Sequence, residues 1–350
     1  MPPDADAIAD CVLSTFDRLP EKRKPRPRND GSREWVPLAG IVLSKAVGNI
    51  LHDWHAEVLA IRAFNRFLLD QYLLISTAPY PDSDFLQQRI ARERSEHELQ
   101  PFTIKDDVQI HMYCSEAPCG DASMELVMDA QEDATPWTSA PPTIPMSSQG
   151  TGPSEQGVGA LRGRSNFSLL GAVRCKPSRP DAPPTLTCER AFSRSGRLTG
   201  LANSLTDSWK GGYRFQSFEV KPTSREFVWS RRSLAQGERA VASNLSAVWT
   251  PSWQETLIGG VLQGRKQLDA RGASKICRSG MCKIAMQIVG TVGIPLLIEA
   301  LGKGTYREMK EAKALEDRRK VKHDIRENGL NGWVRNTGDD GFSLDDTSQA

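Results

Sequence analysis

The sequence predicts a layered α/β domain, and two observations carry that prediction. Apolar residues recur every three or four positions from Val58 to Leu68, which is typical of a helix with one buried face. An apolar run at 34–43 precedes this helix, and alternating apolar residues at 108–112 precede a second helical segment at 121–129. Strand, tight turn and helix therefore follow one another twice, an order typical of helices packed on a sheet.

The rest of the chain divides by composition. Residues 1–33 begin acidic and become basic and rich in proline, which predicts a flexible N-terminal arm. Ser, Thr, Pro and Gly dominate 126–160, which predicts a low-complexity insertion. Residues 187–245 are atypical, because they are rich in Ser and Arg and show no sustained period. A shifted reading frame or a misplaced intron boundary would produce such a segment.

The C-terminal third predicts helices. The apolar stretch 284–301 is short for a membrane span and is broken by Gly and Pro, so it predicts a buried helix pair and no membrane partner. Residues 305–328 predict one highly charged helix with a partial apolar stripe, and Gly329 is placed to cap its end.

The overall composition limits the classes of function. The chain has 350 residues, with 45 Lys and Arg against 43 Asp and Glu, so a strongly basic coat for nucleic acid is excluded but a local basic groove is not. Seven cysteines are scattered along the chain, and the N-terminus has no apolar leader. We therefore expect reduced thiols and an intracellular protein of the cytoplasm, the nucleus or both.

Two short motifs could carry chemistry. His55-Ala56-Glu57 stands at the start of the first predicted helix, and Pro118-Cys119-Gly120 stands between a strand and a helix. Helix N-termini favour thiolates, and neutral imidazole and thiolate are zinc ligands. An H-x-E before a P-C element is the arrangement of zinc deaminases, in which His and Cys bind metal and Glu moves protons.

Each motif is weak alone, because most chance H-x-E matches are capping or surface residues. Their order and their two turn-to-helix positions together favour a metal site. The simpler form of the signature has a second Cys three residues after the first, where this chain has Ala122. A third protein ligand must therefore come from further along the chain.

Longer stretches around these motifs resemble the adenosine deaminase domain of tRNA-specific and double-stranded-RNA-editing enzymes. The matching stretches are 48–69, 115–125, 161–186, 257–278 and 329–344. The resemblance implies a cytidine-deaminase-like layered α/β/α domain with a central mixed sheet and a C-terminal helical elaboration. That domain would span 34–344 and leave a short tail at 345–350.

The resemblance also implies roles for single residues. His55 and Cys119 would bind Zn²⁺, and Glu57 would shuttle protons. A buried inositol hexakisphosphate would be held by residues matching the family's anion-binding positions, namely Arg62, Tyr306, Lys310 and Trp333. Basic residues near the third motif would face RNA, although surface charge is an equal explanation for each: Arg162, Arg164, Arg174, Lys176 and Arg179.

The chain departs from the family pattern in two places. The family has a T-G-x-K strand and turn before its H-A-E helix, whereas here 44–47 runs directly into Gly48. The family follows P-T-L with S-C-S-D-K, whereas here 187–192 reads T-C-E-R-A-F. Cys188 is the nearest thiol, about two residues early, so it is the candidate third ligand. Cys277 and Cys282 are a further option in a context that suggests structural roles.

The predicted function is hydrolytic deamination of adenosine to inosine in tRNA, next to the anticodon and most plausibly in an alanine tRNA. Two alternatives stay open. The chain could be an RNA-binding relative that lacks the third zinc ligand and is inactive. It could also be a defective gene-model product that does not fold stably, because each buried polar group left unpaired costs about 1–3 kcal/mol.

Overall fold

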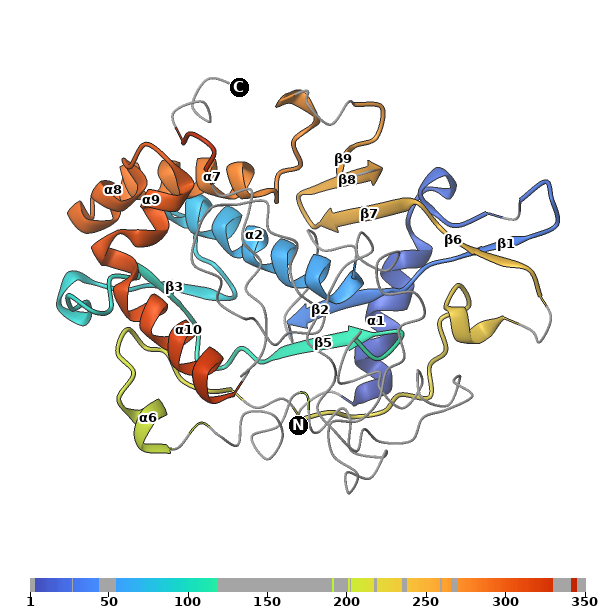
Figure 1. Cartoon of the computed structure of the whole chain (residues 1–350), viewed down its shortest axis with the longest axis horizontal. Coiled ribbons are helices and arrows are strands. Elements are labelled where there is room, and N and C mark those ends of the chain that lie inside the picture. Colours follow the sequence, from blue (N-terminus) through green and yellow to red (C-terminus); the bar gives the residue numbers. More distant parts are fainter. Residues whose placement is uncertain are drawn as a thin grey trace, which may run out of the picture. The chain divides into compact units, whose positions relative to one another are not determined.

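The computed structural model describes residues 4–26, 28–43, 55–118, 191, 201, 203–216, 219–234, 238–258, 260–265, 270–329 and 341–344. The chain divides into two units, the first formed by 1–116, 221–315 and 340–350 and the second by 117–220 and 316–339. Figure 1 shows the ribbon of both. The predicted helix at 121–129 and the predicted insertion at 126–160 lie outside the described residues.

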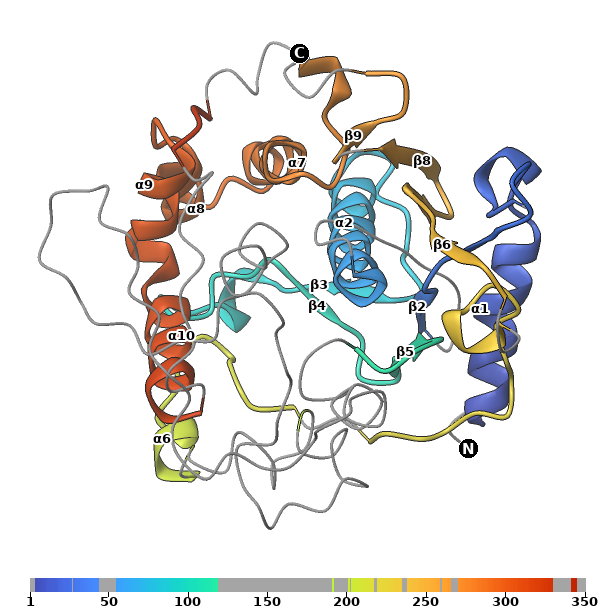
Figure 2. The ribbon, with the colours of Figure 1, turned by 45° about the vertical axis from the view of Figure 1, so that its right-hand side comes forward.

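Helix α2 (Ala56–Ser76) is the central helix of the first unit, as the periodicity predicts. Its small buried residues, Ala60 and Ala63, let it approach its neighbours closely. It packs on strand β2 (Ala39–Leu43) and beside helix α7 (Arg278–Val292). Figures 1 and 2 both show α2 between α7 and the β2 strand.

Strand β2 pairs antiparallel with β5 (Ile110–Cys114), with Ala39 opposite Cys114 and Leu43 opposite Ile110. The apolar run at 34–43 forms two strands rather than one, β1 (Arg33–Trp35) and β2. Pro37 lies between them, and a proline has no amide to donate to a ladder. The mixed helix and sheet character confirms an α/β class.

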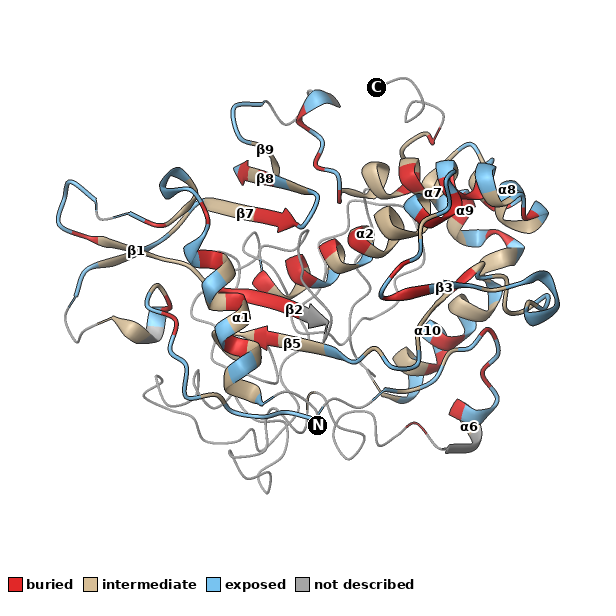
Figure 3. Cartoon of the chain, turned by 180° about the vertical axis from the view of Figure 1, so that it is seen from behind, coloured by how far each residue is buried: buried red, intermediate tan, exposed pale blue. Residues whose placement is uncertain are grey.

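The N-terminal segment differs from the flexible arm that its composition predicts. Residues Ala5–Asp17 form helix α1, which buries Ala9, Val12 and Phe16 in the main apolar cluster. Gly40 of β2 shows how close the helix lies, because a Cβ there would stand 2.8 Å from two methyl carbons of Val12. Figure 3 shows buried positions gathered on α1, α2, β2 and β7, where these elements pack together.

Short strands complete the sheets of the first unit. Strands β7 (Leu245–Thr250), β8 (Trp253–Ile258) and β9 (Val261–Leu262) form an antiparallel meander. Strand β6 (Ala240–Ala242) runs parallel to β1, and β3 (Leu86–Gln88) pairs antiparallel with β4 (Phe102–Ile104). Five single-turn helices lie in the described connections of this unit, η1 (Glu21–Arg23), η2 (Ala91–Glu93), η7 (Arg231–Ser233), η8 (Ala270–Gly272) and η9 (Lys313–Leu315).

The predicted helix pair at 284–301 is confirmed as α7 and α8 (Pro295–Leu301). Gly293 ends α7 with φ of 69°, a left-handed conformation that favours glycine. The charged helix predicted at 305–328 is broken instead. It forms α9 (Tyr306–Glu311) and, in the second unit, α10 (Glu316–Asn328), because Ala312 adopts ψ of 150°. Within the described part of the chain, no helix has the length and apolarity needed to cross a membrane.

The second unit has a small core of its own. Helix α6 (Asn203–Asp207) precedes Trp209, which packs with Val321 of α10. The indole Nε1 of Trp209 donates to Asp324 at 3.0 Å. The Lys320 ammonium donates to the same carboxylate at 2.8 Å and helps to lower the pKa of Asp324. This ordered pair falls partly within 187–245, the segment without sequence periodicity.

Candidate active site

The candidate chemistry lies at the first turn of α2. His55 is the N-cap residue, with φ of −79° and ψ of 127°, and its imidazole does not cap the helix. The His55 side chain is exposed, and Glu57 follows in the first turn, half-buried. The first amides of a helix have no partner within it, so this end carries a partial positive charge. An imidazole and a carboxylate therefore both belong to a helix start where an anion or a polarised water is favoured.

Packing of small residues sets the place of this turn. Ala56 and Ala60 share an apolar cluster with Ala39 and Ile41 of β2, and Cys114 at the end of β5 joins it. The β2–β5 pairing continues beyond β5, since the Ser115 amide donates to the Leu38 carbonyl at 2.7 Å. In return, the Leu38 amide donates to the Ser115 hydroxyl at 2.8 Å. The start of α2 and the exit of β5 toward Pro118 therefore belong to one packed region.

The structure describes only some of the residues predicted to bind zinc or to move protons. His55 and Glu57 are described, whereas Cys119 and Cys188 lie outside the described residues. Among the residues that the structure describes, no three His, Cys, Asp or Glu side chains form a group that could hold a metal. The imidazole of His55 suits zinc chemically, and the thiols remain a prediction. The predicted RNA-facing residues at 162–179 are likewise outside the described part.

The two alternative cysteines have structural roles. The Cys277 sulfur caps α7 by accepting a hydrogen bond from the Gly280 amide at 3.2 Å. Cys282 is buried in the cluster that contains Met309, and burial raises the pKa of its thiol.

Two cations lie over the ring of Tyr306, and Arg62 of α2 interacts electrostatically with the same tyrosine. Arg62, from the second turn, donates from Nε and Nη2 to the Ile276 carbonyl at 3.1 and 2.6 Å. The Lys310 ammonium lies 5.0 Å from the centre of the Tyr306 ring, and the Arg278 guanidinium lies 5.7 Å from it. Burial lowers the pKa of Arg62, and the charge of Arg278 lowers it further. Three of the four residues expected to bind inositol hexakisphosphate are thus brought together, and Trp333 lies outside the described residues.

Arg278 was not predicted from the sequence, although one signal was available. It is the first residue of α7, where the helix dipole disfavours a cation. A basic residue at that position therefore needs an anion or another compensating group nearby. In the sequence, the signal would have been the basic residue Arg278 directly after Lys275-Ile276-Cys277, at the point where the helix begins.

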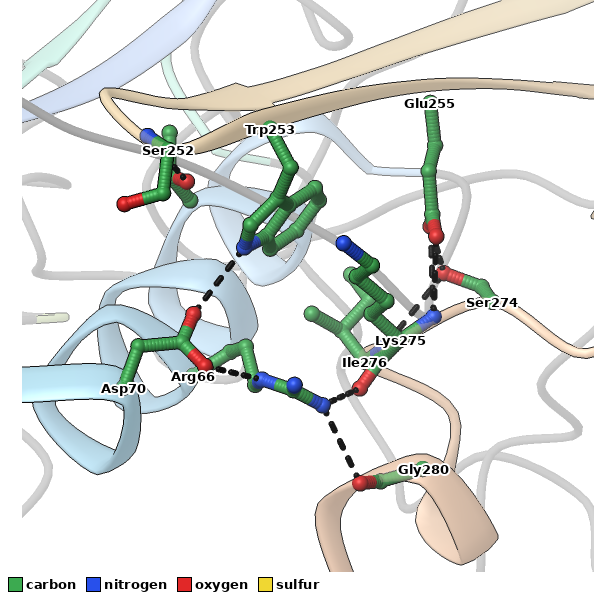
Figure 4. Close-up of polar contacts among 10 residues, drawn as sticks. Arg66, Asp70, Ser252, Trp253, Glu255, Ser274, Lys275, Ile276 and Gly280 are labelled. Carbon is green, nitrogen blue, oxygen red and sulfur yellow. Dashed lines mark hydrogen bonds and ion pairs between the residues drawn. The ribbon is translucent and has the colours of Figure 1, made fainter. Parts of the chain in front are cut away.

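A second arginine of α2 ties three segments together (Figure 4). The Arg66 guanidinium donates to the carbonyls of Lys275 at 2.7 Å and Gly280 at 3.1 Å, and it pairs with Asp70 at 2.9 Å. Asp70 also accepts from the Trp253 indole of β8 at 2.9 Å. We call Arg66, Asp70, Trp253 and the carbonyls they hold the α2 anchor. It fixes α2 to β8 and to the loop that leads into α7.

Glu255 secures the other side of the same loop. Its carboxylate is only 9% exposed and accepts from the Ser274 hydroxyl and from the Lys275 amide at 3.1 Å. Three hydrogen bonds thereby satisfy a buried charge that would otherwise destabilise the fold. The loop at 274–280 is therefore held from both sides, and it carries Arg278, which lies over the Tyr306 ring.

Part of the chain matches a known family. Residues 41–167, which include His55, Glu57 and Cys119, match the model of the Adenosine-deaminase (editase) domain. This match confirms the resemblance seen in the motifs and supports a deaminase enzyme.

Curated relatives agree with the domain match. The chain is 29% identical to the tRNA-specific adenosine deaminase 1 of Schizosaccharomyces pombe, over 95% of each chain. It is 28% identical to the enzyme of that name from Saccharomyces cerevisiae, over 52% of this chain and 49% of the relative. The first alignment spans 406 positions against 350 residues here, so it contains gaps in this chain.

Proposed function

We propose that this chain deaminates adenosine to inosine in tRNA by hydrolysis, next to the anticodon of an alanine tRNA, in the cytoplasm, the nucleus or both. The observation that carries the proposal is the first turn of α2. His55 and Glu57 stand there beside the exit of β5 toward Cys119, inside the matched domain. The names of the curated relatives support tRNA as the substrate. We propose a cytidine-deaminase-like layered α/β/α arrangement for the domain.

His55, Cys119 and Cys188 are the residues proposed to hold Zn²⁺. Zinc, when bound, makes water acidic enough to supply the nucleophile near neutral pH. Glu57 is the only proposed acid and base. It would accept a proton from the attacking water and deliver protons to N1 of adenine and to the amino group, which leaves as ammonia. Water and adenosine thereby give inosine and ammonia.

We also propose that Arg62, Arg278, Lys310 and Tyr306 hold a polyanion, inositol hexakisphosphate, with Trp333 as a further contact. Arg278 and Lys310 lie over the Tyr306 ring, and burial, with the charge of Arg278 in addition, lowers the pKa of Arg62. A group of like charges that is partly withdrawn from water favours a bound anion, and guanidinium groups bind phosphate with paired hydrogen bonds.

The first test measures inosine in a tRNA transcript and zinc bound per chain in the same preparation. We expect inosine at one position and about one zinc per chain in the wild type. His55→Ala should lose both, whereas the control His97→Ala should keep both. Wild-type protein that binds tRNA but holds no zinc and makes no inosine would overturn the proposal.

That outcome would favour the second candidate, an inactive RNA-binding relative. The observation behind it is the T-C-E-R-A-F segment at 187–192, which replaces the S-C-S-D-K of the family. The third candidate is a chain that does not fold stably. Hydrogen exchange separates it from the others, because slow exchange of the α2 amides requires a stable core.

A further inference from the structure

We propose that the edge formed by β1 and β6 is an RNA-binding surface, separate from the residues already assigned to the reaction. We call it the basic edge and define it by Arg26, Arg28, Arg33, Arg231 and Arg239 with Trp35 and Trp229. It would hold phosphates of the tRNA body, so the inference rests on the proposed tRNA substrate.

Positive charge is concentrated in the two segments that build the basic edge. Residues 20–35 and 225–239 together contain ten Lys and Arg and five Asp and Glu. The whole chain has a net charge of only +2, so the rest of the chain is slightly acidic. A local excess of this kind on a nearly neutral protein is the electrostatic pattern of a phosphate-binding surface.

Backbone hydrogen bonds bring the segments side by side. The Arg28 amide donates to the Ser32 carbonyl at 2.9 Å, which folds 28–32 into a turn beside β1. The Arg33 amide donates to the Arg239 carbonyl at 2.9 Å, and β1 runs parallel to β6 from there. The Val36 amide donates to the Trp229 carbonyl at 2.9 Å. Figure 1 shows β1 and β6 adjacent, and Figure 3 shows how much of this region is exposed.

Two tryptophans orient arginines within the edge. The Arg33 guanidinium lies 5.1 Å from the centre of the Trp229 ring, and the Arg231 guanidinium lies 5.9 Å from the Trp35 ring. Arg33 is also held by the Val228 carbonyl and lies 3.9 Å from Glu238. Stacking on an aromatic ring leaves the outer donors of a guanidinium available for phosphate oxygens, with less motion to lose on binding.

Three arginines of the basic edge are exposed, and two of them act on the carboxylate of Asp30. Arg26, Arg28 and Arg239 are exposed. The charges of Arg28 and Arg239 both help to lower the pKa of Asp30, although the hydrogen bonds from Ser32 contribute more. Two guanidinium groups therefore lie near one carboxylate that Ser32 already binds, and the site keeps a positive charge.

The chemistry of the edge favours RNA over a membrane. Arginine forks match phosphate oxygens, and tRNA presents phosphates at regular spacing. A surface that binds lipid needs protruding aromatic side chains on an amphipathic element. Here Trp35 and Trp229 are half-buried beneath arginines, and Val228 and Val241 are the exposed apolar residues of the edge.

The test compares two double substitutions that remove equal charge from exposed positions. Arg28→Ala with Arg239→Ala alters the basic edge, and Arg92→Ala with Lys313→Ala is the control in the same unit. Binding of the full chain to a fluorescent tRNA is measured over a range of salt. We expect the edge variant to bind roughly fivefold to tenfold more weakly, with the salt slope reduced by about 1 per arginine, and the control to change less than twofold.

Equal weakening in both variants would overturn the inference, because it would reflect total charge alone. An edge variant that binds tRNA normally but no longer binds phosphatidylserine vesicles would also overturn it. Arg28→Lys with Arg239→Lys should restore most of the tRNA binding if phosphates are the partner. A wild type that binds tRNA through the basic edge but makes no inosine would support this inference and refute the proposed activity.

Discussion

The first turn and the middle of α2 differ in how they are held. At the first turn, His55 is exposed and Glu57 is half-buried, and Ala56 and Ala60 provide the packing beneath them. From the fourth turn onward, Arg66 and Asp70 are bound to carbonyls and to an indole from two other segments. The side chains proposed for catalysis therefore lie at the start of a helix that is anchored further along its length. Four substitutions test this difference.

Glu57→Gln should give the largest effect, on catalysis alone. Without a carboxylate to carry the proton, the rate of inosine formation should fall at least 10²-fold to 10⁴-fold, roughly the range for loss of a general acid and base. The thermal midpoint should change little, because the Glu57 side chain is only half-buried. Single-turnover deamination assays and thermal unfolding measure the two quantities. A variant that loses stability along with activity would mean that this end of α2 is structural.

Arg66→Met should mainly reduce the stability of the fold, in contrast to Glu57→Gln. It removes the donors to the Lys275 and Gly280 carbonyls and leaves Asp70 without its ion pair. We expect the free energy of unfolding to fall by about 2–4 kcal/mol in urea titrations. Arg66→Lys should recover only part of it, because an ammonium cannot reproduce the planar fork. Unchanged stability would show that the α2 anchor does not support the helix.

Gly40→Ala tests the support that α1 gives to β2, beneath the first turn of α2. The added methyl would stand 2.8 Å from the Val12 side chain, so α1 must shift. We expect a loss of about 1–3 kcal/mol in the free energy of unfolding. Val12→Ala in the same chain should recover part of that loss, since it removes the clashing methyls. Double-mutant unfolding curves measure this coupling, and strict additivity would contradict it.

Asp6→Asn should give the smallest effect, visible only in acid. Hydrogen bonds from Ser224, first, and Thr223 hold the pKa of Asp6 at about 2, below its ordinary value of 3.8. A lowered pKa means that this carboxylate stabilises the folded state above pH 3.8 and that the contribution is lost as the pH falls through about 2. The variant should therefore show a flatter stability profile than the wild type between pH 4 and pH 2. If the stability of the variant fell with pH as steeply as that of the wild type, groups other than Asp6 would cause the acid sensitivity.

Local sequence patterns predicted the position of the candidate site residues better than the structure of the segments around them. The 3.6-residue period and the H-A-E motif placed His55 and Glu57 on the first turn of α2, as the structure has them. The prediction of a flexible arm at 1–33 was wrong where α1 packs, because it weighed the acidic start and the basic, proline-rich 20–33 and overlooked the apolar face formed by Ala9, Val12 and Phe16. It also expected one long helix at 305–328, since no proline or glycine marks the break at Ala312.

Local sequence patterns predicted the mixture of helices and strands, the place of His55 and Glu57 at the start of α2, the α7–α8 pair and the resemblance to adenosine deaminases. These features depend on neighbours along the chain, whose periodicity and turn residues act locally. The group of Arg62, Arg278 and Lys310 near Tyr306, the α2 anchor and the basic edge became visible only in the folded chain. Arg62 and its partner Ile276 are 214 positions apart. Contacts over such separations depend on how packed elements meet in space, and no local pattern encodes that.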